Sequence, residues 1–120
     1  MHEIDIRGFK NGRWSDTKPP AWFDQAKDTD QAWRAAFSGH GVMLVDEFDY
    51  GDRIEIYRAK DATYCVVFWD TNQVILVVFI KAASDYIRFR AEVIEPNVRL
   101  MLASEHLEER DRARRLGRAS

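Results

Sequence analysis

Residues 74–80 (VILVVFI) constrain the fold more than any other segment, because none of their side chains is polar. A short apolar run bounded by turn residues is typical of a strand that is buried on both faces. We expect an α+β domain whose sheet carries its helices on one face. The apolar run adds a condition: either the N-terminal helical segment and the C-terminal helix take opposite faces, or a second subunit covers the remaining face.

Four strands are predicted in series, over residues 42–48, 53–59, 63–70 and 73–80. Residues 49–52 (DYGD) form a turn between the first two, and Thr71 and Asn72 separate the last two. Aspartate, asparagine and glycine are the residues that such turns favour. Because the connections are short, the four strands are expected to form an antiparallel meander.

A fifth strand is predicted over residues 86–94. Every second residue from Ile87 to Val93 is apolar, and the residues between them are Arg88, Arg90 and Glu92. This period of two indicates a strand with one wet face. A helix over residues 86–95 is the alternative, but the strict alternation favours the strand. The sheet is therefore expected to be antiparallel, with about five strands in a meander.

The two ends of the chain are predicted to supply a short strand and the helices. Residues 2–9 alternate like an edge strand, residues 10–13 form a turn, and residues 15–20 form a loop. Residues 21–38 are helical, either continuously or as a short turn followed by a helix over residues 29–38. Gly39 is expected to end this segment in a left-handed conformation. Pro96 opens a long final helix from residue 97 to about residue 116. The chain is expected to be a single domain, 1–120, with residues 108–120 as a charged helical extension.

The composition excludes several classes of protein. The net charge is −2 with 32% charged residues, which argues against bulk electrostatic binding of nucleic acid. Cys65 is the only cysteine, so the chain cannot form an internal disulfide. The start lacks the pattern of a signal peptide, and the longest apolar run is too short for a membrane span. We expect a soluble cytoplasmic protein.

No motif for catalysis, metal binding or cofactor binding is present in the sequence. His2, His40 and His106 lie far apart without ligand spacing. Cys65 is surrounded by apolar residues and is expected to be a buried structural thiol. Residues 38–41 (SGHG) are interpreted as a connector and not as a catalytic element. No catalytic residue, metal or cofactor is therefore assigned.

Two groups of residues are candidates for binding another protein. The first is an acidic and aromatic segment, which is either a solvated turn or a surface that docks on a basic partner. The second is a pair of tryptophans around a proline-containing loop, because an exposed tryptophan is a typical binding hot spot. The candidate partner-binding residues are Asp46, Glu47, Asp49, Tyr50, Asp52, Trp14 and Trp22.

A third group is a candidate for binding anions or nucleic acid. Arg88 and Arg90 are expected to project from one face of the fifth strand, and Arg112 and Arg115 lie in the arginine-rich C-terminal segment. The alternatives are a ladder of cross-strand ion pairs and a helix whose charges neutralise one another.

Three functions follow from these observations. The leading hypothesis is a small non-enzymatic protein-interaction module, such as a regulator, inhibitor, antitoxin or immunity-type protein. Its partner is another protein, and a homodimer is a further expectation. The first alternative is a small-molecule-binding or enzymatic domain in which the sheet wraps the last helix around a cavity, as in helix-grip folds. The second alternative is a nucleic-acid binder that uses the arginines named above.

Overall fold

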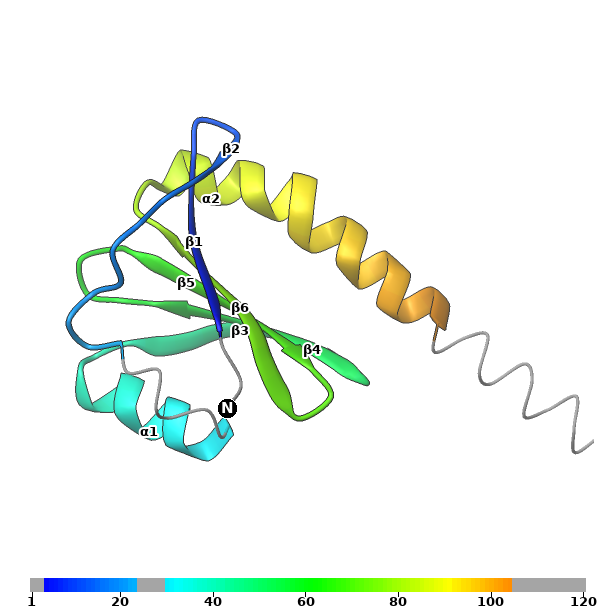
Figure 1. Ribbon diagram of the computed structural model, residues 1–120, viewed down its shortest axis with the longest axis horizontal. Coiled ribbons are helices and arrows are strands. Elements are labelled where there is room, and N and C mark those ends of the chain that lie inside the picture. The colour runs from blue at the N-terminus through cyan, green and yellow to red at the C-terminus, as the bar shows by residue number, and fades with distance from the viewer. Residues whose placement is uncertain (1–3, 24–29, 105–120) are drawn as a thin grey trace, which may run out of the picture.

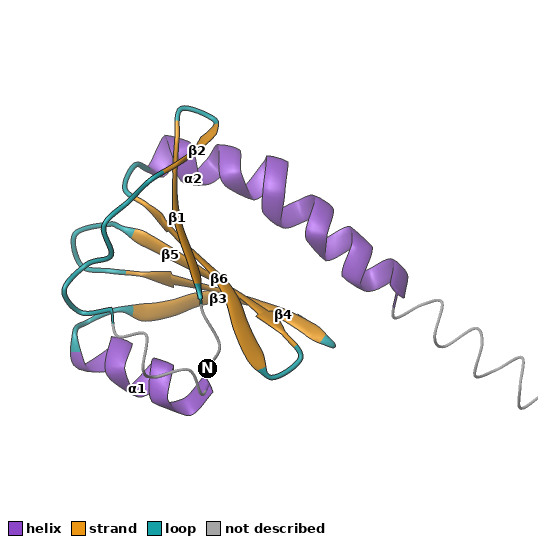
Figure 2. Cartoon of the chain, viewed as in Figure 1, coloured by secondary structure: helices purple, strands orange, loops and turns teal. Residues whose placement is uncertain are grey.

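The computed structural model describes residues 4–23 and 30–104 and confirms an α+β fold (Figure 1). Its elements are β1 (Asp5–Lys10), β2 (Arg13–Ser15), α1 (Asp30–Gly39), β3 (Met43–Tyr50), β4 (Asp52–Arg58), β5 (Tyr64–Asp70), β6 (Gln73–Ile80), α2 (Ala83–Phe89) and the π-helical turn η1 (Arg90–Ile94). The helix continues beyond η1 through residues 95–104, so that one long helix follows the sheet (Figure 2). The predicted extension over residues 108–120 lies outside the described residues.

The strands form one mixed sheet in the order β2–β1–β6–β5–β4–β3. The meander from β3 to β6 is antiparallel, as predicted. However, β1 pairs with β6 in parallel, with Asp5 opposite Leu76 and Gly8 opposite Phe79. The prediction of a purely antiparallel sheet is therefore wrong. Parallel pairing needs a long connection between the two strands, and here α1 and the rest of the meander supply it.

The N-terminal strand is an interior strand and not the predicted edge. Asn11 and Gly12 have φ angles of 54° and 76°, the left-handed pair that a two-residue type I′ hairpin requires. The predicted turn at residues 10–13 is thus confirmed, and Lys10 pairs with Arg13 across it. The chain then folds back as β2, a three-residue strand that the prediction lacks.

The predicted fifth strand is wrong, because residues 86–94 are helical. Tyr86, Phe89 and Ile94 are buried against the sheet, and Val98 and Met101 pack partly buried beside them. Spacings of three to five residues along this face are those of a helix. The alternation in the sequence therefore does not reflect burial, since Ile87 is 68% exposed.

The π-helical turn η1 lets the helix continue past Pro96. The backbone N–H of Glu95 bonds the carbonyl of Arg90, five residues earlier. Pro96 follows directly and has no N–H for the usual bond to residue 92. The widened turn also brings Phe89 and Ile94 onto the same face of the helix, because i→i+5 bonding reduces the rotation per residue. The helix thus begins at Ala83, and the predicted start at residue 97 is wrong.

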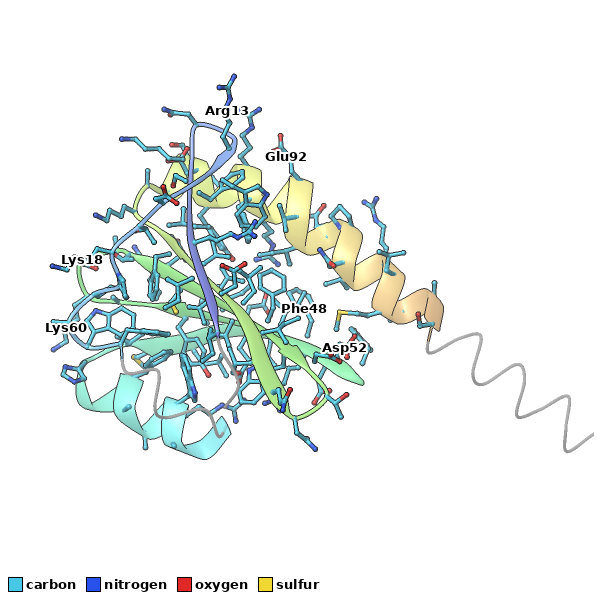
Figure 3. The ribbon with its side chains drawn as sticks, viewed as in Figure 1. Arg13, Lys18, Phe48, Asp52, Lys60 and Glu92 are labelled. Atoms are coloured by element: carbon cyan, nitrogen blue, oxygen red, sulfur yellow. The ribbon has the colours of Figure 1, made fainter. Side chains whose placement is uncertain are left out.

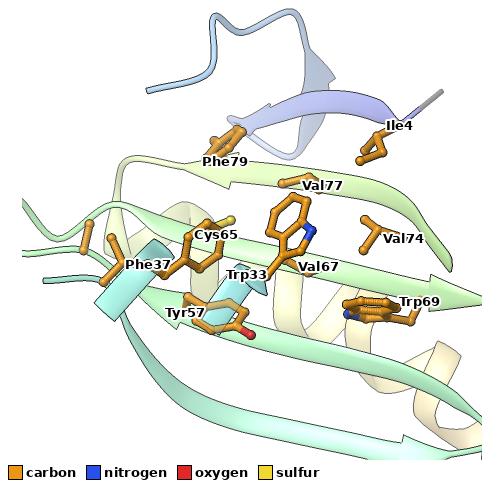
Figure 4. Close-up of a cluster of buried hydrophobic side chains, with 12 residues drawn as sticks. Ile4, Trp33, Phe37, Tyr57, Cys65, Val67, Trp69, Val74, Val77 and Phe79 are labelled. Atoms are coloured by element: carbon orange, nitrogen blue, oxygen red, sulfur yellow. The ribbon is translucent and has the colours of Figure 1, made fainter. Parts of the chain in front are cut away.

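The helices lie on opposite faces of the sheet, so the expectation that they share one face is wrong (Figure 1). α1 covers a cluster formed mainly by residues 33, 37, 57, 65, 67, 69, 74, 77 and 79 (Figure 4). α2 and η1 cover a second cluster that contains Val78 and Ile80 of β6. Residues 74–80 thus contribute to both clusters, as expected if the N-terminal helical segment and the C-terminal helix cover opposite faces of the sheet. No helix in the described part of the chain is long and apolar enough to cross a membrane.

Candidate functional site

The two edges of the sheet differ in length. β2 has three residues and β3 has eight. Because β3 is the last strand of the sheet and pairs only with β4, the N–H and C=O groups on its outer side have no sheet partner among the described residues. A long edge strand of this kind is a template for pairing with another chain. We therefore take the β3 edge as the candidate site.

One end of the β3 edge is apolar. Met43, Leu44 and Val45 are 70%, 37% and 52% exposed. The register with β4 shifts between Leu44 and Asp46, so that Val45 is the extra residue of a β-bulge. A shallow groove of about 370 Å³ lies at this end, lined by Gly41, Met43, Val45, Arg58, Ala59 and Lys60. Met43 and Val45 line this groove, and together with Leu44 they leave apolar side chains exposed at this end of β3 that a partner can bury.

Asp46 and Glu47, in the middle of β3, hold the two helices to this edge. Asp46 Oδ2 forms an ion pair of 3.0 Å with Nη2 of Arg90, which begins η1. Glu47 Oε1 forms an ion pair of 3.2 Å with Nη2 of Arg34 in α1. Successive residues of a strand point to opposite faces, which is why these neighbours reach different helices. Both carboxylates are therefore already neutralised within the fold.

Arg34 also reaches a buried carboxylate that the sequence analysis does not single out. Glu55 of β4 is fully buried and accepts hydrogen bonds from Arg34 Nη2 at 2.9 Å and from Trp69 Nε1 at 2.6 Å. A buried charge requires such partners. In the sequence, Glu55 alternates with Ile54 and Ile56 and thus looks like a residue on a wet face. The face is buried because α1 covers it, which local alternation does not reveal.

The two remaining acidic candidates, Asp49 and Asp52, lie at the other end of β3, beside the β5–β6 turn with Asp70, which the sequence analysis does not single out. We define the acidic tip as Asp49, Asp52 and Asp70, which are exposed and lie at the β3–β4 and β5–β6 turns. Asp52 Oδ1 accepts a hydrogen bond from the backbone of Thr71 at 3.4 Å, which joins the two turns. Among the described residues, no cation forms an ion pair with these three carboxylates.

The predicted turn at residues 49–52 is shorter than expected, and the acidic segment lies mostly in strands. Asp46, Glu47, Asp49 and Tyr50 belong to β3, and Asp52 begins β4. Only Gly51 lies between the strands, with a φ of 95°, a conformation that glycine adopts without steric cost. The candidate residues are thus arranged along a sheet edge, which gives them a fixed register.

The two candidate tryptophans lie on opposite faces of the sheet and away from β3. Trp14 of β2 is 44% exposed and packs edge-to-face on Phe9 and Phe89 at 5.9 and 5.7 Å between ring centroids. Trp22 packs on Phe37 and Phe79 at 5.2 and 5.9 Å in the cluster under α1. The structure therefore does not bring them together as one binding surface.

The expected arginine platform is absent from the described part of the chain. Arg88 and Arg90 lie on a helix and not on one face of a strand, so that placement is wrong. Arg88 pairs with Glu92 at 2.9 Å, and Arg90 pairs with Asp46. The helix separates them because residues two apart on a helix point in different directions. Arg112 and Arg115 lie outside the described residues.

The space between the sheet and the long helix is filled by side chains. Phe9, Phe68 and Phe89 pack there edge-to-face, and Tyr64 stacks on Tyr86 with ring centroids 3.8 Å apart. A groove of about 290 Å³ remains farther along the helix, lined by Phe48, Arg90, Glu95, Val98 and Arg99. This arrangement differs from a sheet that wraps a helix around a ligand cavity.

Residues with reactive or metal-binding side chains are not assembled into a site in the described ranges. The described ranges contain no group of three His, Cys, Asp or Glu residues placed to hold a metal ion. Cys65 is buried, as expected. Burial, and after it the negative charge of Glu55, raises the pKa of its thiol, which disfavours the nucleophilic thiolate. Of the three histidines, His40 lies within the described residues, next to the end of α1, and His2 and His106 lie outside them.

Comparisons of the chain with protein-family models, with curated proteins and with solved structures return no match.

Proposed function

We propose that the protein is a small non-enzymatic protein-binding module, a regulator or inhibitor in its action, that docks by adding a strand of its partner to the β3 edge. In such β-augmentation, backbone hydrogen bonds supply much of the affinity and neighbouring side-chain contacts supply the specificity. The observation that carries the proposal is an eight-residue edge strand whose first three side chains are apolar and exposed.

The chemistry of the two edges supports the choice of β3. An edge with exposed apolar side chains is a liability unless it is covered, and proteins usually shorten or charge such edges. β2 is only three residues long, and the ring of its Trp14 packs on Phe9 and Phe89 on one face of the sheet. β3 is long and carries charge only beyond Val45. Its apolar end is therefore the surface that most needs a partner.

The two alternative functions have less support. A cavity-based function requires an enclosed apolar site, whereas the space under the long helix holds packed aromatic rings. A nucleic-acid function requires cations that are free to contact phosphate, whereas Arg88 and Arg90 each form an ion pair with a carboxylate.

The proposal is tested by affinity capture with the full chain and two matched variants. Val45→Arg puts a long charged side chain on the β3 edge, and Ile87→Arg makes the same change on an exposed position of α2. Because both positions are exposed, each change is expected to alter the free energy of unfolding by no more than about 0.5 kcal/mol. Urea unfolding of the purified variants checks this point.

The wild-type chain and Ile87→Arg are expected to capture the same stoichiometric protein from the native cell, and Val45→Arg to lose it. Equal capture by Val45→Arg would show that the edge is not the docking site. A wild-type chain that captures no stoichiometric protein, under growth conditions in which the chain is expressed, would overturn the proposal altogether.

A further inference from the structure

The β3 edge has opposite chemistry at its two ends. Met43 and Tyr50 are separated by roughly 24 Å, at about 3.4 Å per residue of an antiparallel strand. The apolar groove with Arg58 and Lys60 lies at the Met43 end, and the acidic tip lies at the Tyr50 end. Figure 3 shows Lys60 and Asp52 at opposite ends of the sheet. A strand that pairs with β3 therefore meets different surfaces along its length.

The negative charge at the Tyr50 end is available to a partner. Asp46 and Glu47 are engaged by Arg90 and Arg34, but the three carboxylates of the acidic tip are exposed and form no ion pair with a described cation. Arg53, opposite Asp49 in the register, lies over the ring of Trp69 at 4.4 Å. Complementary charge at an interface steers the encounter and sets the orientation of the partner.

This inference rests on the proposed function. We propose that the segment added to β3 comes from a basic partner protein and runs antiparallel to β3, with lysine or arginine in its N-terminal half and apolar residues in its C-terminal half. Antiparallel pairing is the slightly more stable ladder. In that direction the basic half lies beside the acidic tip, and the apolar half covers Met43, Leu44 and Val45.

A second copy of the chain fits this edge poorly. β3 contains three acidic residues and no basic residue. When two β3 strands pair antiparallel in register, the acidic half of each strand lies beside the apolar half of the other. When the register is shifted, the acidic residues of one strand lie beside those of the other. Like charges on paired strands are destabilising, and apolar side chains opposite carboxylates lose their favourable burial.

The test uses three eight-residue peptides and the full chain. The first peptide has Lys at positions 1 and 3 and Val at positions 6 to 8, the second has the same residues in reverse order, and the third has Glu in place of Lys. Isotope-labelled protein reports where each peptide binds through the shifts of its backbone amide signals. The matched protein variant is Asp49→Asn with Asp70→Asn, which keeps Asp52 and its bond to Thr71.

The first peptide is expected to perturb the amide signals of β3 and to bind more tightly than the other two. Its affinity is expected to fall with added salt, and to fall roughly threefold to tenfold for the double variant, with the larger share from Asp49, because Asp70 ends β5 and lies two strands from β3. Tighter binding of the reversed or the acidic peptide would overturn the inference. So would a stable dimer in sedimentation whose interface maps to β3, because the occupant would then be a second copy.

Capture of the partner by the two variants distinguishes failure of this inference from failure of the proposed function. If Val45→Arg abolishes capture while Asp49→Asn with Asp70→Asn leaves it unchanged, the edge is the docking site but its partner is not recognised by charge. If the double variant loses the partner and Val45→Arg retains it, the acidic tip binds without strand addition. The proposed function then fails together with the inference.

Discussion

Glu47 of β3 lies directly opposite Glu55 of β4, and one guanidinium nitrogen of Arg34 contacts both carboxylates, at 3.2 and 2.9 Å. Two like charges in this position would destabilise the strand pair. The guanidinium from α1 reverses the effect and ties the helix to the edge of the sheet. The β3 edge is thus tied to α1 on one face by Arg34, and to η1 on the other face by the pair Asp46–Arg90.

Replacing Arg34 by methionine is expected to lower the free energy of unfolding by about 2–4 kcal/mol, because it leaves the buried Glu55 without its cation. Urea denaturation followed by far-UV circular dichroism measures the loss. The control is Glu47→Gln, which removes only the half-exposed pair and should cost about 1 kcal/mol or less. Equal small losses in both variants would mean that Arg34 does not neutralise Glu55.

Replacing Gly41 by alanine is expected to destabilise the protein by about 1–2 kcal/mol. Gly41 follows α1 with a φ of 73°, and the bonds Val42 N–H to Phe37 O and Gly41 N–H to Ser38 O form a Schellman motif. The predicted left-handed stop at Gly39 is therefore displaced by two residues. Gly39→Ala is the matched control, because nothing lies within 4 Å of an added Cβ there.

Gly39→Ala should be neutral or stabilise the protein by up to about 1 kcal/mol, since alanine is the better helix former. Thermal unfolding of the two variants side by side measures the contrast. A larger loss from Gly39→Ala than from Gly41→Ala would contradict the assigned end of α1.

Replacing Tyr57 by phenylalanine is expected to make the free energy of unfolding fall less steeply as the pH rises above about 10. Burial, and after it the charge of Glu55, raises the pKa of Tyr57 well above its ordinary value. The unfolded chain ionises first, at about pH 10, so this group stabilises the fold below pH 10 and its contribution is lost as the pH rises further. Tyr86 has a pKa raised mainly by burial as well, so some dependence should remain in the variant.

The same variant is expected to keep or gain stability at pH 7. The hydroxyl of Tyr57 is buried and has no well-formed hydrogen bond with a described group, although Arg34 and Glu55 lie close enough to act on it through weak hydrogen bonds as well as through charge. Removing such a hydroxyl costs little or is favourable, by up to about 1 kcal/mol. Urea unfolding at pH 7, 10 and 11 tests both statements, and a marked loss at pH 7 would show that the hydroxyl has a partner.

Alanine at positions 87 and 89 distinguishes the observed helix from the predicted strand. Phe89 is fully buried and Ile87 is 68% exposed, so Phe89→Ala should cost about 3–5 kcal/mol and Ile87→Ala less than about 0.5 kcal/mol. In a strand the two side chains would share one face and both would be costly to remove. Comparable losses in denaturant unfolding would favour the strand.

Local patterns predicted those parts of the fold that depend on neighbouring residues. The bounds of β6 and the turns at residues 10–13 and 71–72 agree with the structure, because turn residues and apolar runs act over a few positions. The covering of both faces over residues 77–80, all four of which are buried, also follows from the composition of the apolar run, whereas Ile75 near its start is 42% exposed. A strand without a polar side chain is expected to bury most of both faces.

Local patterns failed where the environment depends on distant parts of the chain. The alternation over residues 86–94 is compatible with a strand, but the contacts of Tyr86, Phe89 and Ile94 with the sheet select a helix. Tertiary packing overrides such a pattern, because the buried area of the helical face outweighs local preference. The spacings of three to five residues between apolar side chains from Tyr86 through Met101 are the signal for this face.

The chain by itself determines that there is a two-faced central strand, an antiparallel meander and an acidic segment next to three apolar residues. Only the tertiary structure decides that β3 is an edge, that β1 runs parallel to β6 and that Glu55 is covered by α1. These outcomes depend on which surfaces meet across long separations in sequence. The free energy of that packing comes from burial and charge pairing between elements, such as Arg34 with Glu55, and no local run of residues contains both partners.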